Sequence, residues 1–235
     1  MGVPYKRIML KVSGEVLGGG APGIDAKTVR PICEAIKKVA DMGVQTEIVV
    51  GGGNFWRGRD HLDIDRSKTD SIGMLATVMN ALAFSDYLEK AGVPAKVLTA
   101  FDMPKVAELF THDRAIEALD AGKAVIFACG TGNPCFSTDS GAALRAIETG
   151  ADVYFKSTNV DGVYDKDPNK HPDAVMYDRL SQTDILKNDL RVMDATAAAL
   201  CRDNGLHCLV FNLNDPENIV RAVRGENIGT IIDPD

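Results

Sequence analysis

The chain has 235 residues, of which 45% are hydrophobic and 25% charged, and its formal net charge is −7 at pH 7. This length allows a sizeable core, and the composition is ordinary for a globular protein. The acidic balance disfavours nucleic acids and anionic membranes as partners, because both are negatively charged. No apolar run approaches the ~20 residues of a membrane helix, and the first residues lack a signal-peptide core, so we expect a cytoplasmic protein.

Residues 6–12 form the first predicted strand, which ends at Ser13-Gly14. Gly18, Gly20 and Gly23 then fit the G-x-G-x-x-G pattern of dinucleotide-binding folds. Pro22 lies inside the pattern and no helix opens within it, so we reject that interpretation. Asp25 is instead predicted to cap a helix that ends at Gly43.

The second predicted strand, 45–50, is followed by three consecutive glycines, which would let the backbone approach a ligand closely. Arg57 lies nearby, where it could bind phosphate or simply be solvated. Residues 60–69 are charged and aperiodic, which indicates a flexible lid or an interface segment. A long helix is predicted at 71–90, with Asp70 at its start as either a cap or an acceptor for a ligand hydroxyl.

The central element of the chain is the segment 125–167. An apolar run at 125–129 predicts a strand buried on both faces, and the loop 130–134 (GTGNP) cannot continue it. A helix follows at 137–150, so a glycine-rich loop meets a helix N-terminus, which is a typical phosphate site. A second strand at 152–155 leads toward Asp161-Gly162, a pair that predicts a hairpin turn. The alternative is that a parallel sheet needs such loops without any ligand.

The same criteria predict the remaining elements. Strands are predicted at 95–100, 206–211 and 230–232, and helices at 113–119, 184–190, 194–203 and 215–224, with Asp194 as the cap of the helix at 194–203. Strands that alternate with helices predict an α/β fold, a three-layer αβα sandwich with a central, mostly parallel sheet. We expect one domain over residues 1–235, with two lobes of about 1–150 and 151–235.

Glycine- or hydroxyl-rich turns follow four predicted strands, and one such turn can serve one phosphate group, so four suggest a polyphosphate and a second anionic substrate. The P-loop motif G-x-x-x-x-G-K-[ST] and the protein-kinase motifs are absent from the sequence. The five cysteines are odd in number and form no C-x-x-C pair, which predicts reduced, mostly buried thiols and no cysteine metal site. Cys135, inside the glycine-rich loop, could be oxidisable.

Five motifs resemble the bacterial uridylate kinases of the amino acid kinase superfamily. They are KVSGE at 11–15, VVGGGNFWRG at 49–58, GMLATVMNALA at 73–83, GTGNPCFSTD at 130–139 and NVDGVYDKDP at 159–168. The motifs at 130–139 and 73–83 are specific to uridylate kinases, whereas the other glycine run and NVDGV are shared with acetylglutamate, carbamate and aspartate kinases. The resemblance covers nearly the whole chain in the same order.

The resemblance implies transfer of the γ-phosphoryl group of Mg-ATP to UMP, with Lys11, Arg57 and Asp139 as catalytic residues. Its ATP-binding positions are Lys11, Val12, Ser13, Gly14, Gly53, Arg57, Thr158, Asn159, Tyr164 and Asp167. Its UMP-binding positions are Gly52, Asp70, Thr131, Gly132, Asn133, Pro134, Cys135, Phe136, Ser137 and Thr138. Asp139 would orient Lys11, and Lys156 is a further candidate cation on the phosphate side. Mg²⁺ would arrive with ATP, without a dedicated protein site.

The resemblance also implies a homohexamer with the helix 71–90 at an interface, inhibition by UTP and, in many members, activation by GTP. Here the 18–23 loop is short, and Ser85, Glu89 and His112 stand where we would look for Arg, His and Trp, so GTP activation stays open. Two alternatives to a uridylate kinase remain. One is a kinase of the same fold that acts on a carboxylate or carbamate, and the other is a nucleotide sensor without catalysis.

Overall fold

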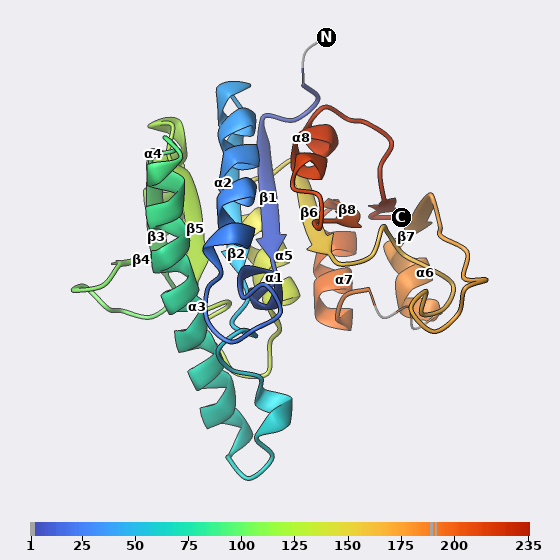
Figure 1. Ribbon diagram of the computed structural model, residues 1–235, viewed down its shortest axis with the longest axis horizontal. Coiled ribbons are helices and arrows are strands. Elements are labelled where there is room, and N and C mark those ends of the chain that lie inside the picture. The colour runs from blue at the N-terminus through green and yellow to red at the C-terminus, as the bar shows by residue number, and fades with distance from the viewer. Residues whose placement is uncertain (1–2, 189, 191) are drawn as a thin grey trace.

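The computed structural model describes residues 3–188, 190 and 192–235, without the Arg59 side chain. Its described part contains one nine-stranded sheet with the strand order β4-β3-β5-β2-β1-β6-β8-β9-β7 (Figure 1). The strands are β1 (Arg7–Val12), β2 (Gln45–Val50), β3 (Ala95–Thr99), β4 (Glu108–Leu109), β5 (Ala124–Ala128), β6 (Val153–Thr158), β7 (Arg179–Ser181), β8 (His207–Asn212) and β9 (Thr230–Asp233). Every neighbouring pair is parallel except β8 and β9, which confirms the mostly parallel sheet.

Helices cover both faces of this sheet. They are α1 (Gly14–Leu17), α2 (Ala26–Asp41), α3 (Arg66–Lys90), α4 (His112–Asp120), α5 (Thr138–Thr149), α6 (Gln182–Lys187), α7 (Ala195–Asp203) and α8 (Glu217–Val223), with a 3-10 turn η1 at Gly58–Asp60. Side chains of α2, α3 and α8 pack with Ile8 and Leu10 on one face. Those of α4, α5, α6 and α7 pack with Met9 on the other, so alternate residues of β1 enter two cores.

Several helix boundaries follow from caps that the sequence shows directly. Asp25 accepts a hydrogen bond from the Lys27 amide at 3.1 Å and Asp194 from the Ala197 amide at 3.0 Å, so both act as predicted. Gly150 ends α5 with a positive φ of 71°, a conformation that favours glycine. No helix in the described part of the chain is long and apolar enough to cross a membrane.

The start of α3 differs from the prediction. Asp65 accepts a hydrogen bond from the Lys68 amide at 3.3 Å and caps a helix that begins at Arg66. Asp70 therefore lies inside α3, and its expected place at the helix start is wrong. Similarly, Ser181 and Asp184 form a capping box that starts α6 at Gln182, two residues before the prediction. Residue 189 of that predicted helix lies outside the described residues.

The predicted hairpin turn at Asp161-Gly162 is also wrong. The segment after β6 does not fold back on β6. It instead pairs with a later segment through an antiparallel bridge between Tyr164 and Met176. A Cβ atom on Gly162 would lie 2.5 Å from the Thr230 hydroxyl, so glycine is needed there for close packing against β9. The Asp-Gly pair indicates a tight turn only when strands flank it directly, and here none follows.

Candidate active site

Four loops meet at one edge of the sheet because they follow four adjacent parallel strands. The order β5-β2-β1-β6 places the carboxyl ends of these strands side by side. The turns after 128, 50, 12 and 158 therefore lie together, as the sequence suggested. In open parallel sheets this edge is where ligands bind.

The glycines of these loops let backbone segments pack directly on one another. A Cβ atom on Gly14 would lie 2.6 Å from the Gly53 amide nitrogen, and one on Gly52 would lie 2.7 Å from the Gly73 carbonyl oxygen in α3. At these distances neither position has room for a side chain. Contacts within the chain thus explain these two glycines, whereas the sequence had suggested contact with a ligand.

A cluster of charged side chains lies at the centre of this edge. Lys11 of β1 and Lys156 of β6 are register partners on neighbouring strands. Asp139, in the first turn of α5, faces both: one carboxylate oxygen is 3.3 Å from the Lys11 amino group and the other is 2.5 Å from that of Lys156. The expected pairing of Asp139 with Lys11 is therefore present, and Lys156 joins it.

The electrostatics of this cluster keep Asp139 ionised. Burial alone would raise the pKa of Asp139, but Lys11, Lys156 and hydrogen bonds from Lys156 and Tyr154 outweigh it and lower the pKa to about 2. Burial lowers the pKa of Lys11, and the nearby Lys156 lowers it further, while Asp139 offsets part of the shift. The two lysines thus share one carboxylate, which leaves the cluster a net positive charge for an anion.

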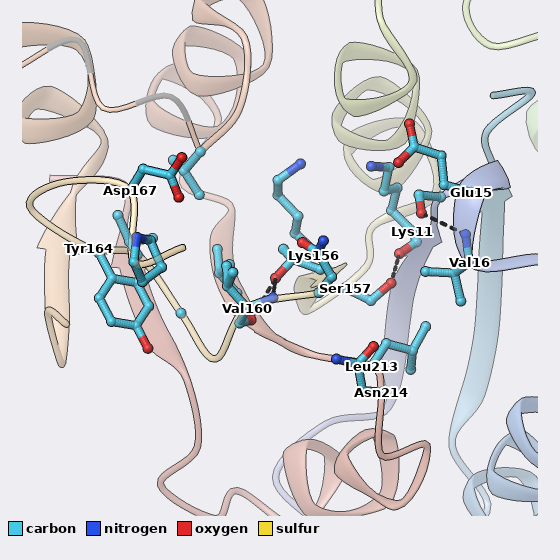
Figure 2. Close-up of a pocket in the computed structure, with 18 of the residues that line it drawn as sticks. Lys11, Glu15, Val16, Lys156, Ser157, Val160, Tyr164, Asp167, Leu213 and Asn214 are labelled. Atoms are coloured by element: carbon cyan, nitrogen blue, oxygen red, sulfur yellow. Dashed lines mark hydrogen bonds between the residues drawn. The ribbon is translucent and has the colours of Figure 1, made fainter. Parts of the chain in front are cut away.

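A large cavity of about 1240 Å³ opens beside this cluster. Figure 2 shows the amino groups of Lys11 and Lys156 pointing in the same direction, with Tyr164 and Asp167 on the far side of Val160. The predicted ATP positions that line it are Lys11, Ser13, Thr158, Asn159, Tyr164 and Asp167. This volume is ample for a nucleotide.

Four predicted ATP positions do not line this cavity: Val12, Gly14, Gly53 and Arg57. The Val12 side chain is fully buried in the core, so only its backbone could meet a ligand. The Arg57 guanidinium lies 2.9 Å from a carboxylate oxygen of Glu15 and donates to the Gly53 carbonyl at 3.1 Å. Arg57, the third predicted catalytic residue, is thus paired with Glu15.

None of the predicted UMP positions lines the large cavity. The loop from Thr131 runs into α5, where the Ser137 hydroxyl caps the helix by accepting from the amides of Asp139 and Ser140. Asp70 reaches this loop from α3, because its carboxylate accepts the Cys135 amide at 2.7 Å. Its expected contact with a ligand hydroxyl would therefore have to share this carboxylate.

The loop is bounded by two non-glycine residues in the left-handed region, Cys129 with φ of 65° and Cys135 with φ of 71°. Cys129 is buried, and its amide donates to the Thr77 hydroxyl of α3 at 2.8 Å. Cys135 is exposed, and its amide bonds to Asp70, so α3 holds the loop at both ends. Cys33, Cys201 and Cys208 are buried free thiols, as predicted.

Three supporting residues escaped the sequence analysis. Asn80 of α3 is fully buried and donates to the Gly51 carbonyl at 2.7 Å and to the Asn54 side chain at 2.7 Å. Asp194, predicted only as a cap, also accepts the Ser140 hydroxyl at 2.8 Å and that of Ser137, which joins α7 to α5. Tyr154 donates to Asp139 at 3.0 Å. In the sequence, the only sign of a special role for these residues is that each is a polar side chain within an otherwise apolar stretch.

The described residues do not fit a metal site of their own. Within them, no group of three or more His, Cys, Asp or Glu side chains could hold a metal ion. Both oxygens of Asp139 face lysines, which repel a cation. The arrangement suits phosphate groups instead, and a Mg²⁺ ion bound by those phosphates would belong to the substrate.

The chain matches a known protein family. A family model described as "Amino acid kinase family" matches residues 6–212. This chain belongs to the amino acid kinase family. The matched range contains all three residues of the charged cluster, Lys11, Asp139 and Lys156.

Solved structures narrow the relationship within the amino acid kinase family. A UMP kinase from Bacillus anthracis is 36% identical with a TM-score of 0.95, and the match covers 99% of this chain and 97% of that one. A UMP kinase from Ureaplasma parvum is 37% identical with a TM-score of 0.90, over 97% and 98% of the chains. The uridylate kinase from Archaeoglobus fulgidus is 31% identical with a TM-score of 0.74, over 96% and 99%. The resemblance to bacterial uridylate kinases is thereby confirmed.

Proposed function

We propose that this protein is a UMP kinase that transfers the γ-phosphoryl group of ATP to UMP, giving ADP and UDP. The observation that best supports this function is the Lys11–Asp139–Lys156 cluster, which lies between a nucleotide-sized cavity and the loop that enters α5. The names of the similar structures, all UMP or uridylate kinases, support this choice of acceptor.

ATP is proposed to bind in the cavity with its phosphates toward Lys11 and Lys156. Among the cavity residues, Thr158 ends β6, Asn159, Tyr164 and Asp167 follow it in the chain, and Ser13 follows β1. UMP is proposed to bind along residues 131–138, with its phosphate near the N-terminus of α5, where helix amides favour an anion. The two phosphates would then meet at the lysine pair.

The chemistry requires position and charge rather than a protein nucleophile. In phosphoryl transfer, negative charge spreads over the transferring group, and fixed cations stabilise it. Lys11 and Lys156 supply two such cations from neighbouring strands, and Asp139 keeps them aligned. Bound UMP supplies the attacking phosphate oxygen, so binding both nucleotides in line provides much of the rate enhancement. Mg²⁺ bound to ATP would neutralise further phosphate charge.

The test is a coupled assay of ADP release with UMP, CMP, dTMP and acetylglutamate as acceptors. We expect UMP to give the highest kcat/KM and CMP to be much poorer, because a site that hydrogen-bonds uracil leaves polar groups unpaired with cytosine. Equal kcat/KM for UMP and CMP would reject UMP specificity. Preference for acetylglutamate would favour a carboxylate kinase, and binding without turnover would favour a sensor.

We infer that the protein assembles as a homohexamer through α3. Ile72, Leu75, Met79 and Leu82 recur along one face of α3 and are 36%, 48%, 51% and 38% exposed. Such a contiguous apolar stripe supports a protein interface. Inhibition by UTP and activation by GTP rest on the family resemblance alone, and titrating each nucleotide into the same assay would test them.

A further inference from the structure

The Tyr154 hydroxyl contacts the Lys11–Asp139–Lys156 cluster from the side of the protein core. Its side chain is fully buried, at 0% exposure, and extends from β6 into the core formed with α5 and α7. The hydroxyl donates to a carboxylate oxygen of Asp139 at 3.0 Å. This is the same oxygen that faces Lys11 at 3.3 Å, while the other oxygen accepts from Lys156.

We propose that Tyr154 is a positioning residue for phosphoryl transfer, which fixes the Asp139 carboxylate so that one oxygen stays directed at each lysine. The inference rests on the proposed function and deepens it, because it adds a residue to the catalytic machinery. Tyr154 acts through Asp139 and does not touch the nucleotides. It lies outside the motifs that indicated the family.

A bound phosphate can draw the lysine partners away from Asp139 but not the tyrosine partner. Lys11 and Lys156 both line the cavity, so a bound phosphate competes with Asp139 for their amino groups. Tyr154 does not line the cavity and has no exposed surface, so its hydrogen bond persists when phosphate binds. Without it, Asp139 could turn about its Cβ–Cγ bond and follow either lysine. The hydroxyl thus keeps one carboxylate oxygen of Asp139 directed at each lysine during transfer.

The surroundings of Tyr154 leave it a neutral donor throughout the working pH range. Burial and the adjacent Asp139 raise the pKa of Tyr154 well above its usual value. The neighbouring thiols of Cys201 and Cys208 also have raised pKa values, chiefly because they are buried, so they stay uncharged. The charged groups that shape the cluster are therefore Asp139, Lys11 and Lys156.

The test compares the wild type with Tyr154→Phe, which removes one oxygen and keeps the ring. We expect kcat with UMP to fall about three- to tenfold, while the KM values for ATP and UMP change less than about twofold. The alkaline limb of the kcat profile should also move to lower pH, since a misaligned carboxylate stabilises the Lys11 ammonium less well. A residue with only a packing role would not move this limb.

Two matched variants separate the hydroxyl from the ring. Tyr5→Phe removes a hydroxyl from a ring that packs edge-on against Phe155, with 5.7 Å between centroids, in the other core, and it should leave kcat unchanged. 3-Fluorotyrosine at position 154 keeps the hydroxyl and should retain kcat within about twofold. Loss of activity in the 3-fluorotyrosine variant would instead assign the effect of Tyr154→Phe to packing.

The outcomes distinguish this inference from the proposed function. A wild type without UMP-dependent ADP release rejects both. An active wild type together with a folded Tyr154→Phe variant of unchanged kcat and pH profile rejects only the positioning role. A raised KM with unchanged kcat also rejects it, because the residue would then act on nucleotide binding.

Discussion

The proposed chemistry depends most on Lys11, because its ammonium is proposed to lie where the charge of the transferring group develops. Lys11→Ala should lower kcat by about 10²-fold or more and change the KM for UMP little. Lys37→Ala, on the surface of α2 and paired with Asp41, is the matched control and should behave as wild type. Near wild-type kcat in Lys11→Ala would show that this lysine has no catalytic role.

Asp70 contacts the loop that is proposed to bind UMP, since its carboxylate accepts the Cys135 amide at 2.7 Å. Asp70→Asn keeps a weaker acceptor, so the KM for UMP should rise several-fold with a smaller change in kcat. Asp113→Asn, whose side chain is 100% exposed on α4, should not change the KM and serves as the control. An unchanged KM in Asp70→Asn would remove this residue from the UMP site.

Strand β2 contains a carboxyl group that the proposed chemistry does not use. Glu47 is fully buried between β1 and β5, and neither of its oxygens has a hydrogen-bond partner among the described residues. Burial raises its pKa to about 8, with smaller opposing effects from Thr149 and Arg7. The folded protein therefore binds a proton at Glu47 that the unfolded chain releases near pH 4.5.

This difference predicts how stability depends on pH. Between about pH 4.5 and 8 the unfolded state binds fewer protons, so the free energy of unfolding should fall as pH rises, by up to ~1.4 kcal/mol per pH unit. Glu47→Gln should flatten this slope, while the exposed Glu34→Gln should keep it. Urea unfolding at pH 5, 6, 7 and 8 measures the effect. Asp139, whose pKa is lowered to about 2, changes the pH dependence of stability only below pH 4.5 and so does not affect this slope. Equal slopes for wild type and Glu47→Gln would contradict the prediction.

Helix α3 shows that periodicity alone does not decide which face of a helix is buried. Its apolar residues recur on both sides, so Met74, Ala81 and Phe84 enter the core while Leu75 and Met79 stay exposed. The spacing at 72, 75, 79 and 82 fits a buried face as well as an exposed one. Only the position of α3 against the sheet shows that this stripe points outward.

The outward stripe predicts the assembly of the whole molecule. Met79→Glu places a charge at the centre of the proposed interface, which costs free energy when buried without a partner, so the oligomer should dissociate into smaller species. Sedimentation velocity measures this, and Arg30→Glu, an exposed charge change on α2, is the control. A wild type that sediments as a monomer would contradict the assembly proposal.

Much of the molecule was predictable because local patterns encode it. Apolar runs bounded by glycines located the central strands, and Asp25, Ser137 and Asp194 located helix starts, since a strand or a cap depends on neighbouring residues. The motifs also brought Lys11 and Asp139 into one proposed site, and the structure places them 3.3 Å apart. The assignment of individual side chains to ATP or UMP stays a prediction.

The sequence by itself determined the alternation of strands and helices, the loops that end the central strands and the residues that resemble one kinase family. Only the tertiary structure decided that Lys156 is the register partner of Lys11, that Tyr154 bonds to Asp139 and that Asp70 accepts the Cys135 amide. Partners far apart in the chain are chosen by strand order and packing. Local propensity does not specify which distant strand lies alongside, so these contacts exist only once the sheet is assembled.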